Sequence, residues 1–266
     1  MSPAGRNTLE IPNTMTQTHS QTLDGKVALV TGAARRLGEA IARMLHGHGA
    51  NLIVHYNTSV GDAQRLQQAL NQQRPDSTVL AQADLHDPRA VAALVDKAVS
   101  AWGHLDVLVN NASTFYPTPF GTVTEAQWDD LLGSNLKGPF FLCQAAAPHL
   151  SPRRGCVVNM VDVYAESPLA FFPAYSIAKA GMHMLTRSLA KELGPHVRVN
   201  GIAPGTILWP ELPQDEEERQ HLIAHTVLQR RGEPHEIAAA ALYLIRDATY
   251  TTGHVLTVDG GRHLYI

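Results

Sequence analysis

Three side chains in the stretch VDVYAESPLAFFPAYSIAKAG (residues 161–181) have the types and spacing of a proton-transfer site. Tyr175 and Lys179 are four positions apart, so in a helix they lie on one face. A phenol has a pKa near ~10, but a neighbouring ammonium stabilises the phenolate and lowers that pKa. Asp162, thirteen positions before the tyrosine, adds a carboxylate that can accept or pass on a proton. The stretch predicts general acid chemistry; an exposed tyrosine beside a solvated lysine is the alternative.

A glycine-containing turn, TGAARRLG (residues 31–38), follows a β-branched run and opens a helix. That context is typical of a dinucleotide site, in which the pyrophosphate lies at the helix N-terminus. Arg35 and Arg36 add two cations where the helix dipole is already positive, and an anion would offset them. A plain strand-to-helix turn is the alternative. The turn residues expected to bind the cofactor are Gly32, Arg35, Arg36, Leu37 and Gly38.

The residues after the second predicted strand favour a phosphorylated cofactor. An NAD site usually has an acid at this point that accepts hydrogen bonds from the ribose 2′-OH. This chain has Tyr56, Asn57, Thr58 and Ser59, which carry no negative charge. Arg35 could reach a 2′-phosphate, so we expect NADPH rather than NADH.

Asp84 and Leu85 follow the third predicted strand, and we place both at the cofactor site. The Asp84 carboxylate could accept a hydrogen bond from the adenine amino group. Capping of the next helix by Asp84 is an equally good interpretation from the sequence.

Seven short runs rich in β-branched residues predict the strands that position these side chains. They are residues 26–30, 51–56, 78–82, 105–110, 155–160, 197–202 and 254–260. Segments between them carry apolar residues at helical spacing, such as Val91, Leu94, Val95 and Ala98. Strands that alternate with helices predict an α/β fold, a Rossmann-like doubly wound parallel sheet in a single domain. Ligands bind beyond the carboxyl ends of such strands, so the segment 205–222, rich in proline and acid, is expected to form a lid.

Composition excludes several classes of protein. The chain has 266 residues, of which 44% are hydrophobic and 17% charged, enough for one large core. A formal net charge of −3 offers no field for nucleic acid or an anionic membrane. No segment approaches the ~20 apolar residues of a membrane span. We therefore expect a soluble protein that binds neither.

Three further features concern the leader, the cysteines and the histidines. Residues 1–24 are polar and predict a disordered leader. Cys143 and Cys156 lie in apolar runs, which predicts buried free thiols and a reducing, cytoplasmic compartment. His221 and His225 are one helical turn apart, but a zinc helix also needs a glutamate after the first histidine and a third ligand. We expect no metal site.

Taken jointly, several motifs resemble the short-chain dehydrogenase/reductases from about residue 24 to the chain end. Besides the turn and the Tyr175–Lys179 pair, they are NNAS (110–113), Asn135 in the next helix and PG (204–205). Two departures narrow the resemblance: Arg36 stands at the second glycine of the usual turn, and Asp162 stands at the catalytic serine.

Both departures, together with NNASTFYPTP (110–119), look like the pteridine reductases. The stretch PGTILWPE (204–211) looks more like the bacterial members. Protozoan members usually carry a basic residue near the end of the second strand, where this chain has Asn57 and Thr58. The sequence therefore predicts that NADPH is preferred to NADH, but it does not predict by how much.

The resemblance implies roles for individual residues. Lys179 would hold the nicotinamide ribose, and Asp162 with Tyr175 would deliver the proton. Asn135 would serve the proton path through a backbone or water contact, although an ordinary polar helix residue is the alternative. A homotetramer is typical of the family. Further cofactor contacts are expected from Asn111, Ala112, Ser113, Pro204, Gly205, Thr206 and Ile207.

Asp162 decides the expected substrate. A carbonyl reductase needs a neutral hydroxyl at the substrate oxygen, which an ionised carboxylate would repel. A pterin ring presents N–H donors and must be protonated on nitrogen as hydride arrives at carbon, and a carboxyl can serve both needs. Phe115 would stack on that ring, unless it is a core aromatic, and Ser113 and Arg36 would donate to it. Leu208 and Trp209 would wall the far side of the pocket.

The sequence thus predicts an NADPH-dependent pteridine reductase. It would reduce a dihydropterin, such as dihydrobiopterin or dihydromonapterin, or dihydrofolate to the tetrahydro form by hydride transfer to a ring C=N. A carbonyl or 3-oxoacyl-thioester reductase on the same fold is one alternative. A non-catalytic NADP(H)-binding regulator is another, which the intact Tyr175 and Lys179 disfavour.

Overall fold

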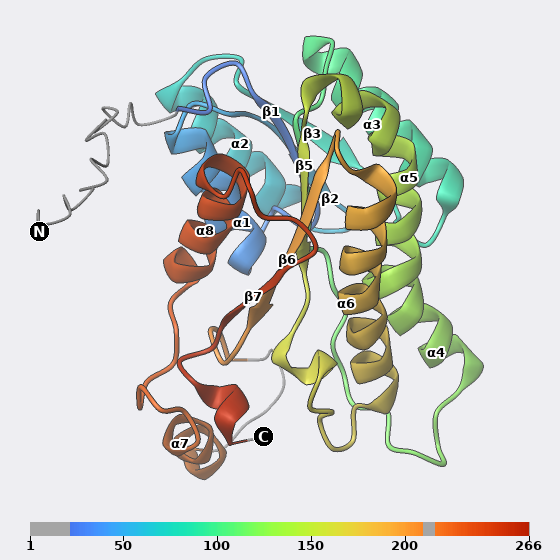
Figure 1. The fold of residues 1–266 in the computed structure, drawn as a ribbon, viewed down its shortest axis with the longest axis vertical. Coiled ribbons are helices and arrows are strands. Elements are labelled where there is room, and N and C mark those ends of the chain that lie inside the picture. Colours follow the sequence, from blue (N-terminus) through green and yellow to red (C-terminus); the bar gives the residue numbers. More distant parts are fainter. Residues whose placement is uncertain (1–21, 210–215, 266) are drawn as a thin grey trace, which may run out of the picture.

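A seven-stranded parallel sheet, in the order β3-β2-β1-β4-β5-β6-β7, forms the centre of the protein (Figure 1). The computed structural model describes residues 22–209 and 216–265. All seven predicted runs form strands, so the predicted Rossmann-like single-domain fold is confirmed. The strands are β1 Val27–Val30, β2 Asn51–Tyr56, β3 Thr78–Gln82, β4 Val107–Asn110, β5 Cys156–Met160, β6 Arg198–Pro204 and β7 Val255–Val258.

Helices cover both faces of the sheet, which explains why its strands are apolar on both sides (Figure 1). In β1, Ala28 and Val30 pack into one core layer and Val27 and Leu29 into the other. One face carries α1 (Arg36–Gly47), α2 (Val60–Gln73) and α8 (Pro234–Leu242). The other face carries α3 (Pro88–Trp102), α5 (Gly138–Leu150) and α6 (Pro173–Leu193).

Two further helices are shorter: α4 (Glu125–Leu132), which packs against α6, and α7 (Glu216–Ala224) (Figure 1). The strand order reverses between β1 and β4, so the carboxyl ends of these strands frame the crevice in which doubly wound sheets bind ligands. Among the described residues, no helix is long and apolar enough to span a membrane.

The predicted leader and lid are only partly described. Residues 1–21 and 210–215 lie outside the described residues. Leu23, the penultimate residue of the predicted leader, is buried, and its backbone N–H donates to the carbonyl of His48 at 2.7 Å. Leu23 therefore belongs to the folded domain. The thiols of Cys143 and Cys156 are free and buried, as expected, and burial raises their pKa to about 12 and about 11.

Candidate active site

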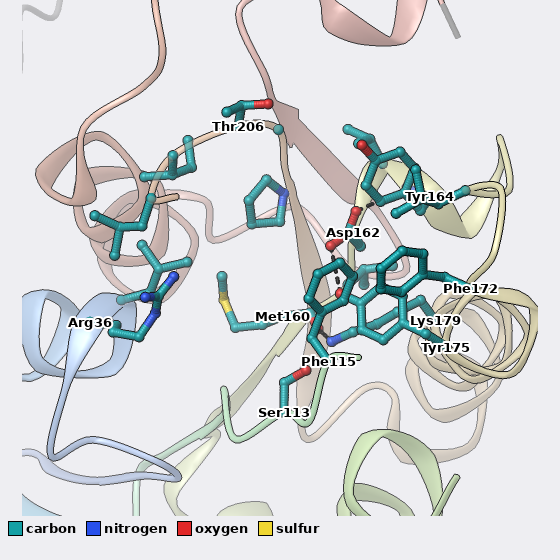
Figure 2. Close-up of a pocket in the computed structure, with 18 of the residues that line it drawn as sticks. Arg36, Ser113, Phe115, Met160, Asp162, Tyr164, Phe172, Tyr175, Lys179 and Thr206 are labelled. Carbon is teal, nitrogen blue, oxygen red and sulfur yellow. Dashed lines mark hydrogen bonds between the residues drawn. The ribbon is translucent and has the colours of Figure 1, made fainter. Parts of the chain in front are cut away.

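Asp162 and Tyr175 meet at the carboxyl end of β5 (Figure 2). The chain leaves β5 at Met160, and Asp162 begins a single 3-10 turn, Val163–Ala165, in which one carboxylate oxygen accepts the backbone N–H of Tyr164 at 3.0 Å. Tyr175 lies in the first turn of α6, and its hydroxyl donates to the other oxygen of Asp162 at 2.7 Å. Both oxygens of the carboxylate are thus occupied and its orientation is fixed.

Burial controls the protonation of this pair. It raises the pKa of Asp162, against the opposing effects of its two hydrogen bonds and of the cations Lys179 and Arg262. Burial, and then the neighbouring Asp162, raise the pKa of Tyr175 well above its ordinary value. The expectation of a lowered pKa for Tyr175 is therefore wrong. Burial of the phenol and the neighbouring Asp162 carboxylate raise its pKa, although Lys179 lies beside it. The phenol keeps its proton at neutral pH and is a donor.

Lys179 lies beside Tyr175, as their spacing on α6 predicts. Its ammonium is 5.5 Å from the centre of the phenol ring and donates to the carbonyl of Met160 at 2.9 Å. Burial lowers the pKa of Lys179 to about 8, against the raising effect of Asp162. An ammonium has three donor hydrogens, and the Met160 carbonyl accepts only one of them. Lys179 is therefore placed to donate to a ligand in the cavity.

Asn135 supports the site from behind. It lies in a π-helical segment, Gly133–Lys137, between α4 and α5, rather than in a regular helix, and such segments are frequent at functional sites. Its amide donates to the carbonyls of Thr114 and Leu131, and its oxygen accepts the hydroxyl of Ser113. Ser113 in turn faces Tyr175 and lowers its pKa. Asn135 thus acts on the phenol through a side chain, a contact that the sequence did not indicate.

Phe115 belongs to an aromatic wall (Figure 2). Its ring stacks on Phe172, with centroids 4.6 Å apart and an interplanar angle of 11°, and meets the ring of Tyr175 edge to face at 4.8 Å. Phe172 was missed by the sequence interpretation, although it immediately precedes Pro173, the first residue of α6. Because Phe172 covers one face of Phe115, a planar ligand can stack only on the other face.

Two cavities join at the turn after β1 and at the residues after β4. The first has a volume of about 420 Å³ and is lined by the predicted catalytic and substrate residues except Asn135 and Trp209. It is lined by Arg36, Leu37, Asn111, Ser113, Phe115, Met160, Val161, Asp162, Val163, Tyr164, Leu169, Phe172, Tyr175, Lys179, Pro204, Gly205, Thr206, Ile207, Leu208 and Leu222. The residues not predicted for the site are Met160, Val161, Val163, Tyr164, Leu169 and Phe172, and Leu222 was expected only as part of the lid.

The second cavity has a volume of about 440 Å³ and contains the residues predicted to bind the adenosine part of the cofactor. The predicted residues that line it are Gly32, Arg35, Arg36, Leu37, Tyr56, Asn57, Thr58, Ser59, Asp84, Leu85, Asn111, Ala112 and Ser113. Four of these, Arg36, Leu37, Asn111 and Ser113, also line the first cavity. The two cavities therefore adjoin along these shared residues.

The start of α1 fits an anionic group. Asp87 and Thr124 cap α3 and α4 through their side chains, whereas Arg35, the N-cap of α1, makes no such bond. A helix N-terminus without a side-chain cap has N–H groups for a phosphate. Gly32 has a φ of +59°, and a Cβ on Gly38 would lie 2.3 Å from the Gly32 carbonyl oxygen, so the turn requires both glycines.

His55, which the sequence interpretation overlooked, fixes the same turn. Its Nδ1 accepts the backbone N–H of Gly32 at 3.1 Å, and its Nε2 lies 3.1 Å from the carbonyl oxygen of Ala83. Burial lowers the pKa of His55 to about 4. The ring is therefore neutral at physiological pH, with its hydrogen on Nε2.

Arg36 connects the turn to the start of the predicted lid. Its guanidinium donates to the carbonyl of Trp209 at 3.1 Å. The ring of Trp209 lies 5.4 Å from the guanidinium of Arg219 and 6.0 Å from that of Arg231, and it does not line the cavity. The expectation that Trp209 walls the pocket is therefore wrong, whereas Leu208 does line it. Cation–π contacts hold the Trp209 ring elsewhere.

Asp84 and Arg35 have other partners in this structure. Asp84 accepts the backbone N–H of His86 at 3.0 Å and lies 2.8 Å from its ring Nδ1, whereas Asp87 caps α3. The capping interpretation of Asp84 is therefore wrong. The guanidinium of Arg35 lies 3.9 Å from the carboxylate of Asp62. Arg35 also lines the second cavity.

Arg36 has a backbone φ of +57°, a conformation that favours glycine. We expect Arg36→Ala to weaken both NADPH and substrate about tenfold, because a charge-assisted contact contributes about 1.5–3 kcal/mol. Arg36→Gly should bind as weakly, yet melt about 3 °C higher than the alanine variant, because it removes about 1 kcal/mol of backbone strain. Thermal melts and fluorescence titrations measure the two effects separately. Unchanged dissociation constants in both variants would make Arg36 a surface residue.

Comparisons with known proteins agree with this geometry. A family model described as enoyl-(acyl carrier protein) reductase matches residues 32–263. Pteridine reductase 1 of Leishmania tarentolae is 36% identical to this chain, in an alignment that covers 90% of this chain and 96% of that protein. The chain belongs to the short-chain dehydrogenase/reductase family. As a member of that family it is an oxidoreductase that uses a nicotinamide cofactor.

Relatives within the family differ in their reactions. A putative ketoacyl reductase of granaticin polyketide synthesis from Streptomyces violaceoruber is 38% identical, over 91% of this chain and 97% of that protein. Among solved structures, a blue fluorescent protein from a metagenomic library in complex with NADPH has a TM-score of 0.85 and 34% identity, covering 91% of this chain and 99% of that one. Membership of the family therefore leaves the substrate to be argued from the site.

Proposed function

We propose that the protein is an NADPH-dependent pteridine reductase that converts a dihydropterin or dihydrofolate to the tetrahydro form. The observation that carries the proposal is the hydrogen bond of 2.7 Å from the Tyr175 hydroxyl to the buried carboxylate of Asp162. Reduction of a ring C=N requires a hydride at carbon and a proton at nitrogen. A phenol backed by a carboxyl supplies that proton.

The two oxygens of Asp162 suit a relay. One accepts the backbone N–H of Tyr164, so a proton on the carboxyl resides on the other oxygen, which faces Tyr175. In the relay, the Tyr175 hydrogen turns from Asp162 to the ring nitrogen, and the protonated Asp162 donates its hydrogen to the tyrosine oxygen and is left as a carboxylate. Burial raises the pKa of both groups, which favours the protonated, neutral form of each.

The cavity offers a place for a planar heterocycle. Phe115 lines the cavity beside Tyr175 and offers an aromatic surface for stacking, and Ser113 and Arg36, which carry hydrogen-bond donors, line the same cavity. NADPH would supply the hydride, held by Lys179 and by the residues after β1. Within this arrangement the chain's own side chains orient the ring and control its protonation.

Ketone or 3-oxoacyl-thioester reduction is the second candidate, because the ketoacyl reductase relative is as similar to this chain as the pteridine reductase. Asp162 favours the pterin, since a carboxyl can pass its hydrogen to Tyr175 as the ring nitrogen takes the tyrosine's hydrogen, a step that the hydroxyl of a serine does not supply. NADPH oxidation should be measured with dihydrobiopterin, with a 3-oxoacyl thioester and without substrate. Faster turnover of the thioester would reject the proposal, and cofactor binding without any turnover would indicate a regulator.

NADPH should have a specificity constant about 10–100-fold higher than NADH, because the end of β2 lacks an acid and Arg35 can pair with a 2′-phosphate. Arg35→Ala should remove most of this preference without changing the rate with NADH. Arg43→Ala is the matched control, since Arg43 lies on the same helix and pairs with Glu39. Equal specificity constants for the two cofactors in the wild type would contradict the prediction.

A further inference from the structure

The C-terminal segment DGGRH (residues 259–263) forms a tight turn after β7. Gly260 and Gly261 have φ values of +65° and +82°, and a Cβ on either one would lie 2.8 Å from a side chain of the segment that follows α7. Asp259 braces the turn, since its carboxylate accepts the backbone N–H groups of Gly261 at 2.9 Å and His263 at 2.7 Å. This turn sets the direction of the residue between them, Arg262.

Arg262 points inward and is only 5% exposed. Its guanidinium donates to the hydroxyl of Tyr164 at 3.1 Å and to the carbonyl of Leu222 at 3.3 Å. Leu222 lies in the last turn of α7, where the helix dipole favours a cation, and its carbonyl also accepts the hydroxyl of Thr226 at 3.0 Å. Across residues 22–209 and 216–265, no carboxylate forms an ion pair with Arg262; its guanidinium lies 6.0 Å from the centre of the Tyr164 ring, and its Nε is buried without a hydrogen-bond partner.

Such a cation is costly to bury, so its position requires an explanation. Tyr164 and Leu222 both line the substrate cavity, although Tyr164 belongs to the 3-10 turn after β5 and Leu222 to α7. Tyr164 is also the residue whose backbone N–H holds the Asp162 carboxylate. Arg262 therefore joins the turn that carries Asp162 to α7, which contains the C-terminal end of the predicted lid.

We propose that Arg262 is a positioning residue for the reaction: through Tyr164 and the end of α7, it holds the Asp162 carboxylate in place and closes the outer wall of the substrate cavity. The nature of the substrate in this proposal rests on the proposed function. The positioning itself does not, because it concerns only contacts within the chain.

The charge of Arg262 also acts on Asp162. The titratable or charged groups that face this carboxyl are Tyr164 from the 3-10 turn, Tyr175 and Lys179 from α6, Arg262 from the C-terminal segment, and Arg36 across the cavity. Arg262 and Lys179 lower the pKa of Asp162 against the larger effect of burial. Removal of the Arg262 charge should therefore raise that pKa further. If the protonated carboxyl is the active form, the alkaline decline of activity moves to higher pH.

Two variants separate the charge of Arg262 from its hydrogen bonds to Tyr164 and Leu222. Arg262→Met removes both the charge and the hydrogen bonds, whereas Arg262→Lys keeps the charge. In Arg262→Met, kcat/KM for dihydrobiopterin should fall about tenfold, mainly through KM, and the alkaline limb should move up by about half a pH unit to one unit. In Arg262→Lys, the limb should return to its wild-type position, while KM stays raised because one ammonium cannot reach both Tyr164 and Leu222. Arg246→Met is the control, since Arg246 pairs with Asp247 and lines neither cavity.

A second readout does not depend on turnover. Carbon NMR of labelled aspartate carboxyls, assigned with Asp162→Asn, reports the titration of Asp162 directly, and it should shift upward in Arg262→Met. Should the wild type reduce no dihydropterin, the proposed function fails, while this titration still decides the role of Arg262. A lowered melting temperature with an unchanged titration and unchanged KM would overturn the proposal. If Arg262→Met does not fold, Tyr164→Phe, which removes the acceptor hydroxyl, should shift the titration in the same direction.

Discussion

Replacement of Tyr175 by phenylalanine should remove nearly all reductase activity and leave NADPH binding intact. The ring would still pack edge to face against Phe115, but the hydroxyl that donates to Asp162 at 2.7 Å would be lost. A general acid contributes about 10²–10⁴-fold to a rate, and we expect a loss in that range. Single-turnover rates and a fluorescence titration with NADPH measure the two properties.

Tyr116→Phe is the matched control for this variant. Tyr116 is another phenol that donates to a carboxylate, that of Asp130 at 2.8 Å, and its pKa is raised to about 12. It lines neither cavity, so the control should keep near-wild-type activity. A Tyr175→Phe enzyme with more than about a tenth of the wild-type rate would exclude the phenol as the general acid.

Replacement of Asp162 should abolish pterin reduction and reshape its pH dependence. Burial raises the pKa of this carboxyl, so it keeps its proton to a higher pH than an exposed aspartate. Because the protonated form feeds the relay, kcat/KM should decline as the pH rises through the apparent pKa of the pair. Tyr175, whose pKa lies well above its ordinary value, does not titrate in this range.

Asp162→Asn keeps the shape and one acceptor oxygen but cannot hold a titratable proton. We expect kcat to fall at least 10²-fold, the alkaline limb assigned to Asp162 to vanish, and binding to suffer less than turnover. Asp162→Ser should also lose pterin reduction, because a hydroxyl does not replace the carboxyl in the relay. The measurement is the pH dependence of kcat/KM for the wild type and both variants. Wild-type rates in the serine variant, or an unchanged profile in the asparagine variant, would reduce Asp162 to an orienting role.

Local patterns sufficed for the fold and for most of the site's members. The seven strands follow from runs rich in β-branched residues, and the central strands β1 and β4 are buried along their whole length. The pairing of Tyr175 with Lys179 follows from helical spacing alone. Parallel strands all end at one edge of the sheet, so the residues after β1, β4, β5 and β6 had to come together.

Contacts between distant segments could not be foreseen in this way. Asn135 reaches Ser113 through a π-helical segment, whose extra residue changes the direction of the side chains. Phe172 covers Phe115 although the two are far apart in the chain. Tyr164 and Arg262 are 98 positions apart, and only packing brings their side chains together.

The sequence by itself determined which chemical groups the site contains and the parallel sheet that gathers them. Only the tertiary structure decided how those groups ionise. Spacing places Lys179 beside Tyr175 and suggests a lowered pKa, yet the pKa of Tyr175 is raised. The reason is physical: desolvation depends on the whole packed environment of a side chain, and at this site it outweighs the single neighbouring charge that the sequence reveals.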